Sequence, residues 1–126
     1  MDKAVREEFF LWLDNVLLQP PPNNTTAFHF NLYEYESSVG VELMGTTDFT
    51  GTGANYWPGD ATFYTDDERF HIPQRVAGET WPQWLETCKT LTVDYIENGS
   101  QNRFLRQSKG VGIGFVDGDM YLIWSQ

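Results

Sequence analysis

The two histidines of this chain are its clearest candidates for chemistry. Near neutral pH an imidazole can act as a general base, and together with carboxylates it can hold a metal ion. His29 and His71 each lie in a short alternating segment, on the side opposite the apolar row. In a sheet they could meet across neighbouring strands, so a small hydrolase or metal-dependent enzyme using His29, His71 and nearby carboxylates is one hypothesis. Because no spacing requires such a site, we expect no catalytic residue, no metal and no cofactor.

Other signatures of catalysis are missing from the sequence. The single cysteine, Cys88, allows neither an intrachain disulfide nor a cysteine-based zinc site, and it falls on the apolar side of a predicted helix. Gly51-Thr52-Gly53 lacks the third glycine of a dinucleotide-binding fingerprint, and no Gly-Lys-Ser/Thr occurs. These glycines therefore predict turns and close packing.

Acidic residues dominate the charge of the chain. Eighteen acids against eight Lys and Arg give a net charge of -10. Between Glu7 and Glu68 there are eleven acids and no Lys or Arg, and eight of the eleven lie between Glu34 and Glu68. Such a charge repels a phosphate backbone, so we expect no direct binding of nucleic acid. It suits a basic partner, or it simply keeps the chain soluble.

Aromatic side chains are interleaved with these acids. Tyr and Trp are rigid anchors of protein interfaces, and carboxylates steer a basic partner toward them. Alternatively, the rings cover a second sheet face or pack under a loop. The predicted partner-binding residues are Tyr33, Glu34, Glu36, Glu42, Asp48, Tyr56, Trp57, Asp60, Asp66, Asp67 and Glu68.

Two amphipathic helices are predicted to support this surface. Apolar residues in 3–18 follow a period of 3.6, Asp2 can cap the start, and three prolines from Pro20 end the helix. Thr80 and Gln83 form a capping box for a second helix that ends at Asn98-Gly99.

Three hairpins are predicted from residues that alternate with period two. The first joins 27–36 to 39–43 through Ser37-Ser38, which pairs Leu32 with Leu43 unless the loop is longer. The second joins 61–65 to 69–72. The third joins 110–116 to 119–125 through Asp117-Gly118, a type I′ turn signal, and pairs Val111 with Trp124 and Ile113 with Leu122. Residues 45–59 remain irregular, long enough to suggest either a function or a missed strand.

The order of these elements predicts a single α+β domain over residues 1–126. Without βαβ repeats we expect an antiparallel sheet of about six strands, formed by the three hairpins, with both long helices packed on one face. No signal peptide and no membrane-spanning run is found, which favours a cytoplasmic protein that does not contact membranes.

Several segments resemble bacterial immunity proteins of polymorphic or contact-dependent toxin systems. The resemblance lies in Phe30-Asn31-Leu32-Tyr33-Glu34, Val41-Glu42-Leu43-Met44-Gly45 and Gly114-Phe115-Val116-Asp117-Gly118-Asp119, within a small acidic α+β chain. It implies a protein that binds and neutralises a cognate toxin domain, often a basic nuclease. It maps no individual functional residue.

We therefore expect a non-enzymatic binding protein, monomeric or weakly dimeric, that blocks a basic partner through its acidic, aromatic surface. Two alternatives remain open. One is the small hydrolase described above, and the other is a structural subunit that self-associates through an uncovered sheet face.

Overall fold

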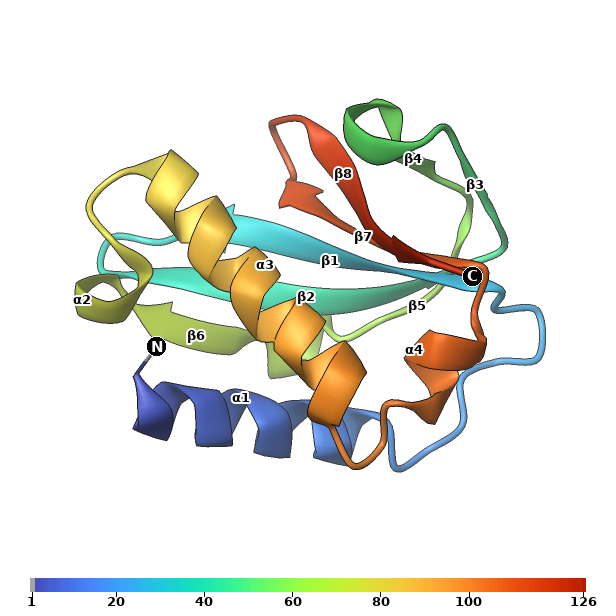
Figure 1. Ribbon diagram of the computed structural model, residues 1–126, viewed down its shortest axis with the longest axis horizontal. Coiled ribbons are helices and arrows are strands. Elements are labelled where there is room, and N and C mark those ends of the chain that lie inside the picture. Colours follow the sequence, from blue (N-terminus) through green and yellow to red (C-terminus); the bar gives the residue numbers. More distant parts are fainter. Residues whose placement is uncertain (1) are drawn as a thin grey trace.

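A six-stranded mixed sheet is the centre of the computed structural model, which describes residues 2–126 (Figure 1). The strand order is β5-β2-β1-β7-β8, and β6 also pairs with β2. This α+β architecture agrees with the predicted class. The strands are β1 (Ala27–Glu34), β2 (Ser38–Thr46), β5 (Ala61–Tyr64), β6 (Phe70–Pro73), β7 (Gly110–Phe115) and β8 (Met120–Ser125).

One strand pair contradicts the predicted antiparallel sheet. Strand β7 runs parallel to β1, with Phe28 opposite Val111 and Leu32 opposite Phe115. A parallel pair needs a long crossover connection, usually with a helix. Here the crossover consists of residues 35–109, which include a long helix at 81–98. One such crossover allows a parallel pair, so the absence of βαβ repeats does not exclude it.

The second predicted hairpin is also wrong. Strands β5 and β6 do not pair with each other; both pair antiparallel with β2, β5 near Met44 and Gly45 and β6 along residues 38–41. A 3-10 turn, η2 (Asp66–Glu68), connects them along this edge. Thr65 holds the junction, since its Oγ1 accepts a bond from the Leu43 N–H at 2.8 Å and its N–H donates to the Leu43 carbonyl at 3.0 Å.

The other two hairpins form with altered registers. In the first, Leu32 lies opposite Val41 and not Leu43, because the turn is centred one residue earlier than predicted, and the Tyr35 N–H donates to the Ser38 carbonyl at 3.0 Å. This shift of two in the pairing keeps every side chain on its predicted face. In the last hairpin Val111 pairs with Trp124 as predicted, but an irregularity after Val111 places Ile113 opposite Tyr121. Its turn is not type I′, because neither Asp117 nor Gly118 has a positive φ, and Gly118 donates its N–H to the Phe115 carbonyl.

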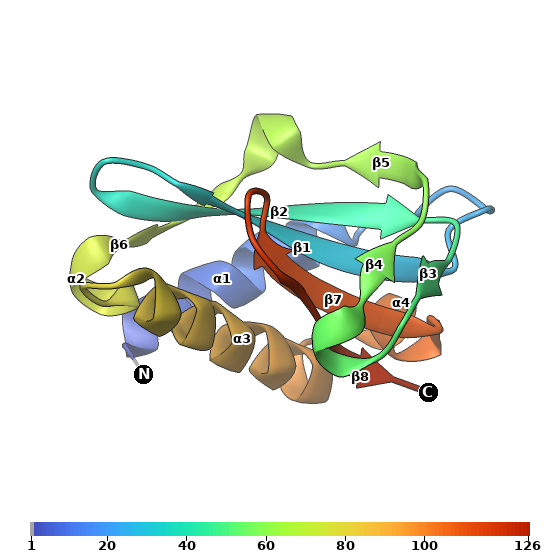
Figure 2. The same cartoon turned by 90° about the horizontal axis from the view of Figure 1, so that it is seen from above.

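Two long and two short helices accompany the sheet: α1 (Lys3–Val16), α2 (Gln74–Ala77), α3 (Trp81–Asn98) and α4 (Arg103–Gln107). Asp2 caps α1 by accepting the Val5 N–H, and Gln83 accepts the Thr80 N–H at the start of α3. Side chains from α1 and α3 enter the same core as the apolar rows of β1 and β2. Figures 1 and 2 show both helices lying beside the sheet. Cys88 is buried there, and burial raises the pKa of its thiol to about 12.

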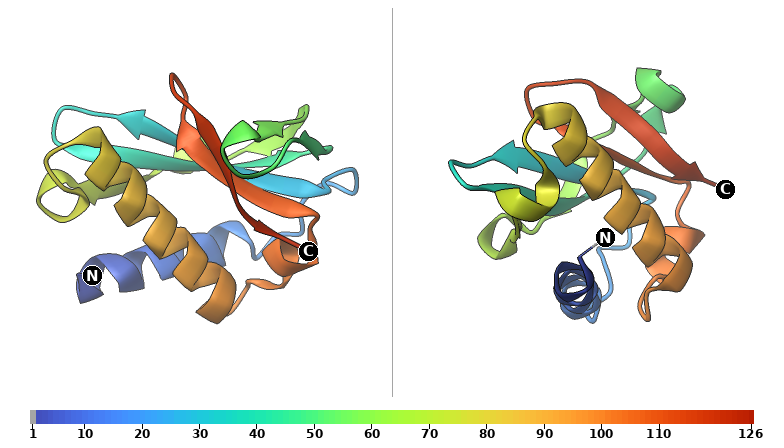
Figure 3. Two further views of the ribbon diagram at one scale, coloured as in Figure 1. Left: turned by 45° about the horizontal axis from the view of Figure 1, so that its top comes forward. Right: turned by 60° about the vertical axis from the view of Figure 1, so that its left-hand side comes forward.

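Residues 47–60, here called the flap, are not wholly irregular, and of the two explanations for this long segment a missed strand is confirmed. The flap holds β3 (Phe49–Thr50), η1 (Gly53–Asn55) and β4 (Trp57–Pro58), and its ends are joined by the Thr47 N–H and the Asp60 carbonyl. It forms a separate two-stranded sheet beside β8 (Figure 3). Within residues 2–126 no helix is long and apolar enough to cross a membrane.

Candidate functional site

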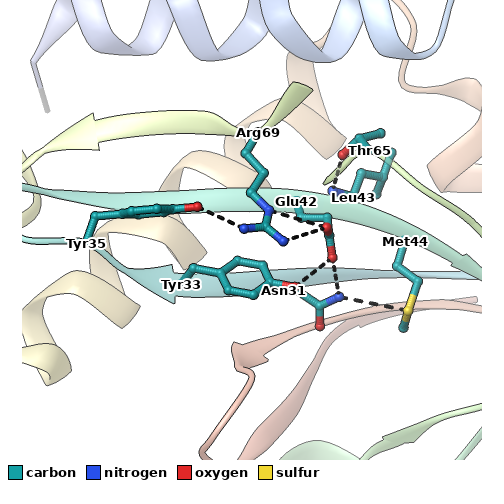
Figure 4. Close-up of polar contacts among 8 residues, drawn as sticks. All are labelled: Asn31, Tyr33, Tyr35, Glu42, Leu43, Met44, Thr65 and Arg69. Carbon is teal, nitrogen blue, oxygen red and sulfur yellow. Dashed lines mark hydrogen bonds and ion pairs between the residues drawn. The ribbon is translucent and has the colours of Figure 1, made fainter. Parts of the chain in front are cut away.

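Glu42 is the centre of a polar network on the sheet face that does not carry the main core (Figure 4). Only 1% of this residue is exposed. Its Oε1 accepts bonds from Asn31 Nδ2 at 2.9 Å and from the Tyr33 hydroxyl at 3.0 Å, and its Oε2 lies 3.3 Å from Arg69 Nη2. The carboxylate is therefore fully occupied by internal partners.

Arg69 closes this network from β6's side of the sheet. Its guanidinium lies 3.7 Å from the centroid of the Tyr33 ring, and Nη1 donates to the Tyr35 hydroxyl at 2.8 Å. The hydrogen bond to Tyr35 raises the pKa of Arg69. The pKa of Tyr33 is also raised, mainly by burial and secondly by its hydrogen bond to Glu42. Arg69 directly follows the stretch from Glu7 to Glu68, which has no Lys or Arg. Its charge is paired within the network with Glu42.

The structure does not bring the two histidines together. His29 lies opposite Met44 on one side of β2, and His71 lies opposite Gly40 on the other. These positions are four residues apart along β2, or about 13 Å. His71 is exposed and contacts Ser38 and Tyr35, whereas His29 is buried, so the geometry required by the hydrolase hypothesis is absent. Nor do residues 2–126 contain three or more His, Cys, Asp or Glu grouped to hold a metal ion.

The eleven predicted partner-binding residues do not form one surface. Glu42 and Tyr56 are buried, at 1% exposure each, so neither can contact a partner in this conformation. Glu36 precedes β2 and Asp48 follows it, which places them at opposite ends of a strand about 26 Å long. Asp48 is also 3.5 Å from Lys109 Nζ.

The remaining members are exposed or half-buried at separate places. Tyr33 and Glu34 end β1, Trp57 and Asp60 lie on the flap, and η2 carries its three acids on the outer edge of the sheet. Exposed acids are thus distributed around the sheet instead of being concentrated on one face.

Two of the predicted residues do border a groove, which we call the acidic groove. It has a volume of about 590 Å³ and lies between the start of α3, the end of β1 and the turn that joins β7 to β8. Its lining is Leu32, Tyr33, Glu34, Trp81, Leu85, Phe115, Val116, Asp117, Gly118, Asp119 and Tyr121. Three of these are acids and none is a base.

Local contacts fix the walls of the acidic groove. Trp84 Nε1 donates to the Gly78 carbonyl at 2.6 Å, and the Trp84 ring lies 6.4 Å from that of Phe115, so the start of α3 is held against the end of β7. The Val116 N–H donates to the Leu32 carbonyl at 3.2 Å and ties the turn to β1. This framework leaves Trp81 56% exposed and Val116 43% exposed beside the opening.

The sequence did not predict Trp81, Asp117 or Asp119 as functional residues. Trp81 falls in the predicted second helix, Asp117 in the predicted turn of the last hairpin, and Asp119 at the start of the strand that follows it. Each assignment is reasonable locally, because Asp favours turns and Trp81 fits the apolar period. Only the folded chain shows that these three residues and Glu34 surround one groove.

No family model matches this chain, and neither a curated protein nor a solved structure matches it. Function has therefore to be inferred from the surface itself. The Glu42 network is internally satisfied. In the described part of the chain, Glu34, Asp117 and Asp119 make no side-chain hydrogen bond or ion pair, so the acids of the acidic groove are available to a ligand.

Proposed function

We propose that this chain is a non-enzymatic binding protein that neutralises a basic protein, namely a cognate toxin domain of the nuclease type. The resemblance to immunity proteins supports the class of partner. The observation that carries the proposal is the charge of the surface, and its consequences concern association more than folding.

Most of the acids are free to act on a partner. Within residues 2–126 four acids, Asp2, Glu42, Asp48 and Asp94, form ion pairs, which leaves 18 − 4 = 14 without one. The four pairs occupy Arg6, Arg69, Arg75 and Lys109, half of the eight bases. Outside these pairs 14 acids face only four bases, so the unpaired charges carry the whole net charge of the chain (4 − 14 = −10).

A nuclease provides the complementary surface. Its substrate site is positively charged because it binds a phosphate backbone, and an acidic protein can occupy that site without entering the reaction. Opposite charges also speed the encounter, by about 10-fold to 1,000-fold at low salt. The same negative surface keeps this chain from competing for the nucleic acid.

The test begins by looking for a toxin domain encoded by a gene next to that of this chain, whose absence would count against the proposal, and then asks whether this chain neutralises that domain. We expect co-expression to restore growth of cells that produce that domain. For the purified pair we expect the association rate constant to fall at least tenfold between about 50 and 500 mM NaCl. Failure to restore growth, or an association rate that ignores salt, would refute the proposal.

Charge reversal distinguishes a specific surface from net charge. We expect Glu34→Lys with Glu36→Lys to slow association by about tenfold or more if these acids face the partner. Glu7→Lys with Glu8→Lys on the exposed side of α1 makes the same change in net charge and is the matched control. Glu42 is unsuitable for this test, because it is buried in the network.

A further inference from the structure

We propose that the acidic groove is the anchor site of this protein and that it receives an arginine side chain of the basic partner. The inference rests on the proposed function for the identity of the partner. The site itself can be tested without that partner.

The shape and lining of the groove fit a long side chain with a charged end. A volume of about 590 Å³ is within the range of pockets that enclose small ligands. Leu32, Leu85 and Phe115 line it with apolar surface, which suits the methylene stem of arginine. A purely apolar occupant would leave the carboxylates beside it unpaired and poorly solvated.

The carboxylates specify a cation. Glu34 ends β1, whereas Asp117 and Asp119 lie in or next to the turn between β7 and β8, so the acids approach the groove from two elements. All three are exposed and have no ion pair among residues 2–126. The planar guanidinium has five donors in a fixed geometry and can bind more than one carboxylate, whereas an ammonium group acts as a single point charge.

The exposed indole of Trp81 favours the same group. A guanidinium stacks on the face of Trp more readily than an ammonium does, and Trp gives the strongest cation–π attraction among the aromatic side chains. Arg69 shows the arrangement elsewhere on this chain, since its guanidinium lies over the Tyr33 ring and against the Glu42 carboxylate. Tyr33 belongs to both places, because it also lines the acidic groove.

Two cations lie against rings that line the groove. Arg69 lies over Tyr33 and is paired with Glu42, whereas Lys89 lies over Tyr121. Lys89 Nζ is 4.2 Å from the centroid of the Tyr121 ring, and Tyr121 lines the groove, although Lys89 does not. Its charge opposes an incoming cation. We therefore expect Lys89→Gln to strengthen arginine binding by about twofold.

The experiment is an NMR titration of the full chain with N-acetyl-arginine amide. We expect saturable shifts at the Trp81 indole N–H and at the backbone amides of 116–119, with a dissociation constant of about 1–10 mM, as befits a very small ligand. N-acetyl-citrulline amide has nearly the same shape without the charge, and we expect it to bind at least about tenfold more weakly. N-acetyl-lysine amide should also bind more weakly than the arginine probe.

Charge-neutral variants locate the binding. Glu34→Gln, Asp117→Asn and Asp119→Asn combined should weaken arginine binding by about tenfold or more. Glu7→Gln, Glu8→Gln and Glu97→Gln combined change the net charge equally at exposed positions outside the groove, and should change binding by less than about twofold. All six positions are exposed, and thermal melts check that both variants fold.

Three results would overturn the inference. Equal binding of citrulline would show that the groove does not recognise the positive charge. Shifts spread over acids elsewhere would show general counterion binding, and tighter binding of lysine would exclude a guanidinium site. None of these results touches neutralisation of the toxin domain. Conversely, a failed co-expression test with a successful titration would leave an arginine site whose partner is of another kind.

Discussion

The phenol ring of Tyr56 lies parallel to the imidazole of His29, with the ring centroids 5.5 Å apart and the planes 11° from parallel. Tyr56 comes from the flap and His29 from β1, so this stack joins the flap to the sheet. His29 is completely buried and Tyr56 nearly so. Within residues 2–126, the two ring nitrogens of His29 and the hydroxyl of Tyr56 have no hydrogen-bond partner.

Burial of His29 predicts a loss of stability in acid. Burial lowers its pKa to about 4, against an ordinary value of 6.5, so the unfolded chain binds this proton first as the pH falls. The contribution of neutral His29 to the free energy of unfolding is fully present above pH 6.5. It is lost as the pH falls toward 4, and the loss is at most about 3 kcal/mol. Urea melts of the wild type and His29→Leu at pH 7.5 and 4.5 should show the extra loss only in the wild type. An equal loss in both proteins would contradict a neutral, buried His29.

Tyr56 should stabilise through its ring and not through its hydroxyl. Tyr56→Phe keeps the stack and removes an unpartnered buried hydroxyl, so the free energy of unfolding should stay the same or rise by up to about 1 kcal/mol. Tyr56→Ala removes the ring and should cost about 3–5 kcal/mol. Thermal and urea melts measure both. A large loss in Tyr56→Phe would show that the hydroxyl has a partner in solution.

Gly112 should be required for the flap to pack against the sheet. A Cβ at this position would overlap the Tyr56 ring, so Gly112→Ala should lower the free energy of unfolding by about 1–3 kcal/mol. The matched control is Gly118→Ala, where the nearest atom to a new Cβ is 3.7 Å away, an ordinary contact. If Gly112→Ala acts through the flap, its effect should shrink in a Tyr56→Ala background. Additive effects would place the damage elsewhere.

Replacing Arg69 should lower the free energy of unfolding, because Arg69 supplies the positive charge that pairs with buried Glu42. Arg69→Met keeps most of the side-chain stem but leaves a buried carboxylate without its ion pair, at a cost of about 3 kcal/mol. Adding Glu42→Gln should recover part of that loss. Arg75→Met is the control, since its pair with Asp2 is exposed and should contribute less than about 1 kcal/mol. Chemical denaturation of the four proteins gives the comparison, and equal losses for Arg69 and Arg75 would contradict a buried pair.

Local signals in the sequence predicted the two long helices and the faces of the strands well, but not the short helix α2. Asp2 and the proline run bound α1, and the Thr80–Gln83 pair begins α3, because capping depends on residues only a few positions apart. Alternation likewise placed His29, Tyr33 and Glu42 on the same side of the first hairpin, and the shift of register by two did not change this.

Distant contacts could not be predicted from these signals. Alternation shows which side of a strand a residue occupies, but not what covers it, so neither Tyr56 over His29 nor Arg69 over Tyr33 was expected. The alternation of side chains in β5 and β6 would be the same whether these strands paired with each other or both paired with β2, so it could not distinguish the two arrangements. The acidic groove depends on three separated segments, and for that reason only Tyr33 and Glu34 among its lining were predicted.

The parallel pairing of β1 with β7 also sets the order in which this chain can fold. The β1–β2 hairpin joins near neighbours and can form within about 1–10 µs, whereas Phe28 and Val111 are 111 − 28 = 83 residues apart. Until that long loop closes, β1 carries an unpaired apolar edge, which other chains can extend. We therefore expect closure of this loop to be both the slow step of folding and the period of greatest risk of aggregation. Destabilising the last hairpin should then lower the yield of folded protein before it alters the native structure.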